Sequence, residues 1–233
     1  SITSTVQVNA TAGFSIVTFT GNGTGGATIA HGLGALPHMI LSKSRGHAEN
    51  WAVYHQFSNA TPEDYYLALD DNRAATDSNV VWNDTAPTST LITLGSQDKI
   101  NKSSSTHIAF CFTEIQGYSK FGSYKGNITS GSDGTFVYTG FKPAWIMLKR
   151  TDVADGWHIF DNKRDVDNVI EHRIEADSSS AEHTTVDWCD LLSNGFKLRY
   201  NGGGVNVSGG THIYMAFAEN PIVGTNNIPA TAR

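Results

Sequence analysis

The chain has 233 residues, of which 39% are hydrophobic and 16% are charged, with a formal net charge of −6. This length suffices for one large β-domain or two small ones without metals or disulfides. The negative charge and the scattered Lys and Arg argue against nucleic-acid binding, because clustered cations bind phosphate backbones. No apolar run approaches the ~20 residues that span a membrane, so membrane insertion is not expected.

Short β-strands are predicted along the whole chain. Apolar residues alternate with polar ones, or form short runs bounded by Gly, Asn, Ser or Pro, which is typical of strands. In the first half the expected strands lie at 14–19, 39–43, 51–54, 65–69, 91–94 and 107–112. This spacing predicts an antiparallel sandwich or jelly roll. For 179–192 we expect a loop with at most one helical turn.

The second half of the chain repeats the first at an offset of about 105 residues. Residues 106–114 (THIAFCFTE) match residues 211–219 (THIYMAFAE). The same offset, drifting by one residue, aligns Trp82 with Trp188. Such self-similarity at a fixed period indicates that one structural unit has been duplicated.

The repeat predicts an all-β protein of two tandem homologous antiparallel β-sandwich units, jelly-roll-like and packed together. We expect the first unit at 13–116 and the second at 117–222. Residues 1–12 are then an amino-terminal connecting segment, and residues 223–233 a carboxy-terminal tail. Because the chain starts at Ser1 rather than Met, we expect it to be a fragment or a processed product.

Residues kept in both units are expected to serve the fold, whereas residues present once are candidates for function. The paired tryptophans, Trp51 with Trp157 and Trp82 with Trp188, are therefore predicted to pack in the core, with sugar stacking as the alternative if they are exposed. His107 and His212 open the last strand of each unit and are expected to bond to a neighbouring loop rather than to a ligand. Glu114 and Glu219 have no second carboxylate nearby in sequence, which argues against an acid/base pair.

Motifs for catalysis and cofactor binding are not found in the sequence. Cys111 and Cys189 have no second Cys or His at ligand spacing, so buried thiols are expected rather than a disulfide or a metal site. The Gly-rich runs at 21–26 and 202–204 lack the Lys-Ser/Thr ending of a phosphate loop and are expected at hairpin tips. We therefore expect no catalytic residue, no metal and no cofactor.

Several strings resemble a domain that recurs in tailed bacteriophages, many of them marine. They include 13–21 (GFSIVTFTG), 114–124 (EIQGYSKFGSY), 138–145 (YTGFKPAW), 191–199 (LLSNGFKLR) and 214–221 (YMAFAENP). The resemblance covers nearly the whole chain. It implies the carboxy-terminal part, of jelly-roll or lectin-like type, of a tail fibre or another surface protein of the virion.

Resemblance and repeat together favour a non-enzymatic virion module that acts in host-cell attachment. Its expected location is the surface or tail of the phage particle. Expected partners are other virion proteins, further copies of the chain (a trimer is favoured) and a glycan or protein of the host surface. One alternative is a capsid-decorating or head-fibre protein that coats or stabilises the particle. The other is a glycan depolymerase, which needs two carboxylates roughly 5 to 10 Å apart in a groove.

Polar and aromatic residues present in one unit only are the candidates for glycan binding by loops. The candidates are His47, Asn50, Tyr65 and Tyr66 in the first unit, and Tyr200 and Asn201 in the second.

Overall fold

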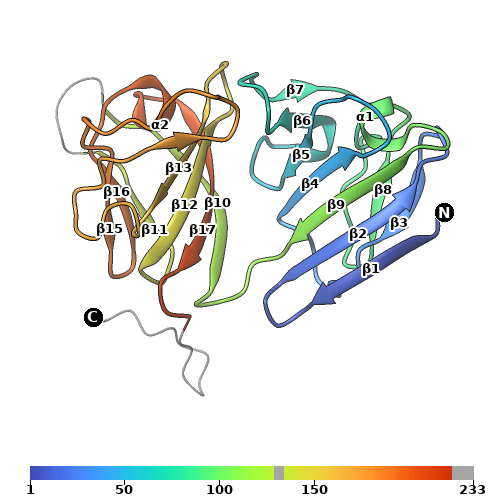
Figure 1. The fold of residues 1–233 in the computed structure, drawn as a ribbon, viewed down its shortest axis with the longest axis horizontal. Helices are drawn as coiled ribbons and strands as arrows, with labels where there is room; N and C mark the ends of the chain where they lie inside the picture. Colours follow the sequence, from blue (N-terminus) through green and yellow to red (C-terminus); the bar gives the residue numbers. More distant parts are fainter. Residues whose placement is uncertain (129–133, 222–233) are drawn as a thin grey trace. The chain divides into compact units, whose positions relative to one another are not determined.

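The computed structural model describes residues 1–128 and 134–221. The chain divides into two compact units, unit 1 at Ser1–Glu114 and unit 2 at Ile115–Arg233. Both units are built of antiparallel strands with a few short helical turns (Figure 1). The predicted all-β, antiparallel fold class is confirmed.

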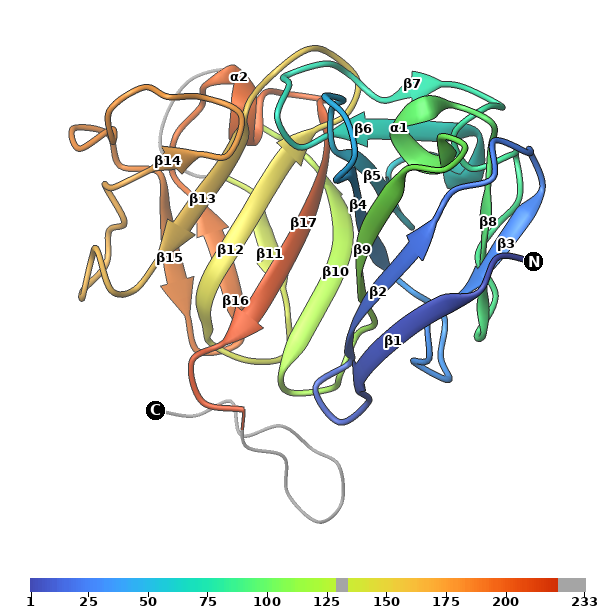
Figure 2. The ribbon, with the colours of Figure 1, turned by 45° about the vertical axis from the view of Figure 1, so that its right-hand side comes forward.

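Unit 1 contains a seven-stranded sheet in the order β1-β2-β9-β4-β5-β6-β7 (Figures 1 and 2). In that order the strands are Ser4–Asn9, Phe14–Thr20, Thr106–Phe112, Met39–Ser44, Ala52–His55, Tyr65–Ala68 and Thr76–Asp77. A second, smaller sheet pairs β3 (Ala27–Ala30) with β8 (Leu91–Leu94). Two short helical turns complete the unit, η1 (Pro62–Asp64) and α1 (Asp98–Asn101).

Unit 2 contains a five-stranded sheet in the order β10-β17-β12-β13-β14. In that order the strands are Ser119–Lys125, Thr211–Ala218, Pro143–Arg150, Trp157–Asp161 and Ile174–Glu175. Its second sheet has the order β11-β16-β15, with strands Phe136–Tyr138, Gly195–Leu198 and Cys189–Leu192. The helical turn α2 (Gly203–Asn206) precedes β17.

The two units share one topology. The order β2-β9-β4-β5-β6 in unit 1 matches β10-β17-β12-β13-β14 in unit 2, and the pair β3-β8 matches β11-β16. The turns α1 and α2 stand at equivalent places, each just before the last strand of its unit. The repeat found in the sequence is therefore also a repeat of strand order.

In each unit the core lies between the two sheets. Alternate side chains of β2 are buried, as the period of two in its sequence predicts. The core of unit 1 joins residues of the large sheet, such as Val17 and Cys111, to Ile29 and Ile92 of the small sheet. Side chains from two facing sheets that fill one core define a sandwich.

The tryptophans at 82 and 188 are part of these cores. Trp82 is 1% exposed and Trp188 is 4% exposed, so both pack inside their units. Trp157 is also buried, whereas Trp51 is only half-buried. The expectation that the paired tryptophans serve packing is confirmed for three of these four residues.

The amino-terminal segment differs from the prediction. Residues 1–12 were expected to connect, but β1 pairs with β2 from Ser4 opposite Phe19 to Asn9 opposite Phe14. A comparison of the repeats passes over this strand because the part of unit 2 that the structure describes contains no counterpart of it. The boundary between the units also falls two residues earlier, after Glu114. The tail at 223–233 lies outside the described residues.

Two local predictions are also resolved. The Gly run 202–204 is not a hairpin tip: Gly202 precedes α2, and Gly203 and Gly204 are its first two residues. Residues 179–192 form no helix and end in β15.

A buried asparagine holds the loop that follows β2 in unit 1 and the loop that follows β10 in unit 2. In unit 1, Asn101 accepts a hydrogen bond from the Asn22 N–H (2.9 Å). Its amide nitrogen donates to the carbonyls of Thr24 (2.9 Å) and Gly95 (3.1 Å). In unit 2, Asn206 accepts from the Asn127 N–H (3.3 Å). The same side chain thus satisfies backbone groups in both copies.

Replacing Asn101 with Ala should lower the free energy of unfolding by about 2 to 4 kcal/mol, because a buried N–H and two carbonyls lose their partner. Urea unfolding followed by tryptophan fluorescence measures this loss. The matched control is Asn59→Ala, at an exposed position whose change should stay within about 0.5 kcal/mol. Equal effects of the two substitutions would refute the role given to Asn101.

Candidate functional site

Unit 2 carries an open groove of about 830 Å³. It is formed by three segments that are far apart in sequence, 168–169, 185–187 and 199–201, together with Asp190 of β15. None of these segments lies within a regular strand or helix. The groove is therefore built of loops on a rigid β-scaffold, an arrangement common in binding sites.

The loop that connects the smaller sheet to the helical turn is longer in unit 2 than in unit 1, and in unit 2 it lines the groove. Residues 95–97 join β8 to α1, whereas the longer stretch 199–202 joins β16 to α2. In unit 1 the Gly95 N–H donates to the Val81 carbonyl (2.6 Å), and a Cβ on Gly95 would lie 2.0 Å from the Val80 oxygen. Gly95 thus packs directly on the chain before Trp82. In unit 2 the longer connection carries Arg199, Tyr200 and Asn201 along the groove.

Asp190 and Arg199 form an ion pair in the groove wall. The guanidinium Nε donates to Asp190 Oδ2 at 2.6 Å, and Nη2 contacts the same oxygen. The Asp190 side chain is 8% exposed and that of Arg199 is 38% exposed. Pairing offsets the cost of burying the Asp190 carboxylate. This part of the wall is consequently neutral and holds a fixed geometry.

Tyr200 presents an aromatic surface to the groove. It is 36% exposed, and its ring packs edge-on against the buried Trp188, with the ring centroids 4.7 Å apart. The guanidinium of Arg173 lies 4.3 Å from the centroid of the same Trp188 ring. Arg173 is paired in turn with Glu175 (3.0 Å). The packing of Trp188 therefore holds the Tyr200 ring in place.

The buried His158 interacts with two carboxylates inside unit 2, one of which is Glu175, the partner of Arg173. The His158 ring, 2% exposed, places its Nε2 3.3 Å from Asp155 and its Nδ1 3.3 Å from Glu175. The hydrogen bond from His158 holds the pKa of Glu175 below its ordinary value, and the Arg173 charge lowers this pKa further. A Cβ on Gly204 would lie 2.0 Å from His158 Nε2, so α2 can approach this closely only with Gly there. These contacts fix the scaffold beside the groove.

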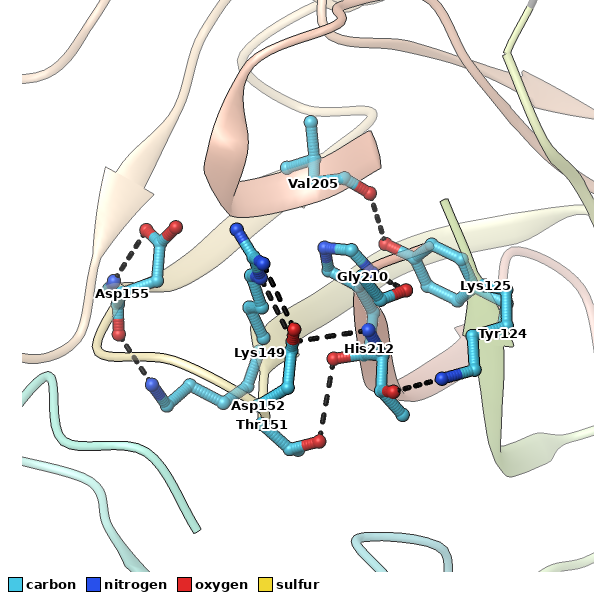
Figure 3. Close-up of polar contacts among 12 residues, drawn as sticks. Tyr124, Lys125, Lys149, Thr151, Asp152, Asp155, Val205, Gly210 and His212 are labelled. Atoms are coloured by element: carbon cyan, nitrogen blue, oxygen red, sulfur yellow. Dashed lines mark hydrogen bonds and ion pairs between the residues drawn. The ribbon is translucent and has the colours of Figure 1, made fainter. Parts of the chain in front are cut away.

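Figure 3 shows the same end of unit 2, where Lys149 donates to the Asp155 carbonyl and the Asp155 carboxylate accepts from a backbone N–H. Nearby, Tyr124 donates to the Val205 carbonyl (2.7 Å), which ties β10 to α2. The His212 ring stacks on Tyr124 with centroids 4.9 Å apart, and its Nδ1 lies 3.1 Å from the Gly210 carbonyl. The prediction that His212 bonds to a neighbouring loop is confirmed.

His107 of unit 1 repeats the stacking seen in unit 2. It stacks on Phe19, with ring centroids 5.2 Å apart, as His212 does on Tyr124. Burial lowers the pKa of His107 and that effect outweighs a backbone hydrogen bond. Both histidines are therefore part of the repeated packing.

The structure brings two of the six predicted binding residues together, Tyr200 and Asn201 in the groove. His47 bonds instead to the Ser44 hydroxyl (2.8 Å), and the Asn50 amide donates to Asp70 (3.1 Å). These side chains stabilise local loops of unit 1.

Tyr65 and Tyr66 lie in β6 rather than in a loop. Tyr66 is 6% exposed, and its hydroxyl accepts from Arg73 (2.8 Å) and Lys99 (3.4 Å). The predicted strand at 65–69 is confirmed, but Tyr66 is not available to a glycan as predicted, because successive side chains of a strand point to opposite faces and that of Tyr66 enters the core. Tyr65, its neighbour, is half-buried.

Other groove residues were not predicted, namely Asn168, Asp187, Asp190 and Arg199. No sequence pattern indicated them. The offset between the repeats falls from 106 residues at Trp82 and Trp188 to 105 at Asn101 and Asn206, so this stretch is one residue shorter in unit 2 and does not reveal the longer connection at 199–202.

The two thiols are free and buried. Burial raises the pKa of Cys111 to about 12 and that of Cys189 higher still, so neither is a ready nucleophile. In residues 1–128 and 134–221, no group of three or more His, Cys, Asp or Glu is placed to hold a metal ion. The described chain likewise contains no helix that is long and apolar enough to cross a membrane.

Comparison with known proteins gives one match. A family model described as a domain of unknown function, DUF7483, matches residues 1–221. The chain belongs to this family. No curated protein and no solved structure matches the chain. The DUF7483 match includes both units, so the duplicated pair is the family domain.

Replacing Arg199 with Ala should lower the free energy of unfolding by about 2 kcal/mol, because the buried Asp190 carboxylate loses its partner. The loss should be smaller than the roughly 3 to 5 kcal/mol of a fully buried pair, since Arg199 keeps solvent contact. Thermal unfolding by circular dichroism measures it. The double variant Asp190→Asn with Arg199→Gln should recover part of the loss, and equal destabilisation in both variants would contradict the pairing.

Proposed function

We propose that this DUF7483 protein is a non-catalytic module on the surface of a phage particle, and that it binds a host-cell glycan in the groove of unit 2. The observation that carries the binding proposal is the exposed, rigidly packed Tyr200 beside polar groove residues. The virion location rests on the resemblance of strings such as 114–124 to a domain of phage surface proteins.

The chemistry of the groove is suited to a saccharide. A sugar ring has an apolar face surrounded by hydroxyls, so it is bound by an aromatic surface together with side chains that both donate and accept hydrogen bonds. Within the described chain the Asn201 side chain makes no hydrogen bond, which leaves its amide for a ligand. The Asn168 amide is held in place by two hydrogen bonds with the Leu191 backbone, at 3.0 and 2.9 Å. The groove thus combines a stacking surface, an available amide and fixed walls.

The carboxylates of the groove support binding rather than hydrolysis. Glycoside hydrolysis requires two carboxylates with separate roles on either side of the scissile bond. The groove contains Asp187 and Asp190, and Asp190 is buried in its ion pair with Arg199. Asp190 is thus engaged in the groove wall by Arg199, which favours a structural role for this carboxylate.

The location in the particle can be tested by electron microscopy of intact virions. Attachment predicts density for this chain at a tail or a fibre tip. Density spread over the capsid lattice would instead support the decoration alternative and contradict the proposed role.

Replacing Tyr200 with Ala should weaken binding to host cells or to a glycan-array ligand at least tenfold, about 1.4 kcal/mol, because the stacking surface is lost. The matched control is Tyr138→Ala, which removes a tyrosine that is 60% exposed and lies on β11 outside the groove. Circular dichroism should show both variants folded. Undiminished binding by the Tyr200 variant would reject this groove as the site.

A further inference from the structure

We infer that the groove selects glycans that carry a free ammonium group, with Asp187 and Tyr200 as the residues that recognise the cation. This inference rests on the proposed glycan binding and narrows its ligand class. It follows from the charges around the groove.

Asp187 is the unpaired charge of the groove. It lies exposed on the segment just before Trp188, and its side chain makes no ion pair or hydrogen bond within the described chain. The other two charged groove residues, Asp190 and Arg199, neutralise each other. The groove therefore presents one net negative charge to a ligand.

The surroundings do not offset this charge. Arg173, which interacts electrostatically with Tyr200, is paired with Glu175 at 3.0 Å, and Asp155 and Asp177 also act on it. The whole chain has a formal net charge of −6, which adds attraction for cations at longer range.

The aromatic wall favours the same ligand. The face of a tyrosine attracts an ammonium group through its π-electrons, and a nearby carboxylate adds direct Coulomb attraction. An anionic sugar would instead be repelled by the negative charge of the Asp187 carboxylate. Arg199 offers it little compensation, because its Nε and Nη2 are both engaged by Asp190.

Unit 1 shows that the fold does not require a carboxylate at this place. Alignment of Trp82 with Trp188 puts Val81 at the position of Asp187, and Val81 is fully buried in the core of its unit. The same topology thus tolerates an apolar residue where unit 2 exposes Asp187. Because the fold of unit 1 forms without a carboxylate at this position, Asp187 is a candidate for function.

The test compares glucosamine oligomers with N-acetylglucosamine oligomers of equal length, titrated calorimetrically into the full chain. The free-amine oligomer should bind about fivefold more tightly at low salt, as one partly exposed ion pair predicts. This preference should fall in 0.5 M salt, because salt screens exposed charges. In Asp187→Asn it should disappear, whereas Asp187→Glu should retain it. The control Asp77→Asn removes one exposed charge from unit 1 and should leave it unchanged.

The outcomes separate the two proposals. Equal binding of both oligomers, with both lost in Tyr200→Ala, would overturn the ammonium preference and leave glycan binding standing. A preference that survives in Asp187→Asn would also overturn it. If neither oligomer binds, the ammonium preference fails. Glycan binding itself then stands or falls with the loss of host-cell binding in Tyr200→Ala.

Discussion

The burial of Trp188 is the constraint on which the groove depends. Its indole fills the core of unit 2 and contacts Phe160 (6.0 Å between ring centroids), while Tyr200 and Arg173 pack against the same ring. Because the ring cannot move without opening the core, the side chains packed on it are held as well. Tyr200 can therefore present its exposed surface in a fixed orientation, which lowers the entropic cost of binding a ligand.

The duplication separates what the unit needs to fold from what one copy uses. Both copies keep the sandwich, the buried tryptophan, the stacked histidine and the asparagine that holds the first loop. Around this shared frame unit 1 buries Val81 and packs Gly95 on the chain, whereas unit 2 exposes Asp187 and Tyr200. The functional difference thus lies in a few loop residues on an unchanged scaffold.

Charged residues make up only 16% of the chain, and those beside the groove are largely paired. Arg199 with Asp190 and Arg173 with Glu175 are neutral units around the groove. His158 stands between two carboxylates in the interior beside them. Asp187 has no such partner in the described chain, so its carboxylate contributes an uncompensated negative charge to the groove. The hydroxyl and amide groups that dominate the composition fit recognition of a polar ligand.

The fold class, the repeat and most strands could be predicted from the sequence, since the period-two alternation of a strand such as Phe14–Thr20 is a local property. The sequence also indicated Tyr200 and Asn201, which occur in one unit only. Tertiary structure alone decided that β1 pairs with β2, that Tyr66 is buried, and that Asn168, Asp187 and Arg199 meet in one groove. These features depend on contacts between segments that are separated in the sequence. The local pattern of apolar and polar residues in one segment does not specify which other segment will pack against it.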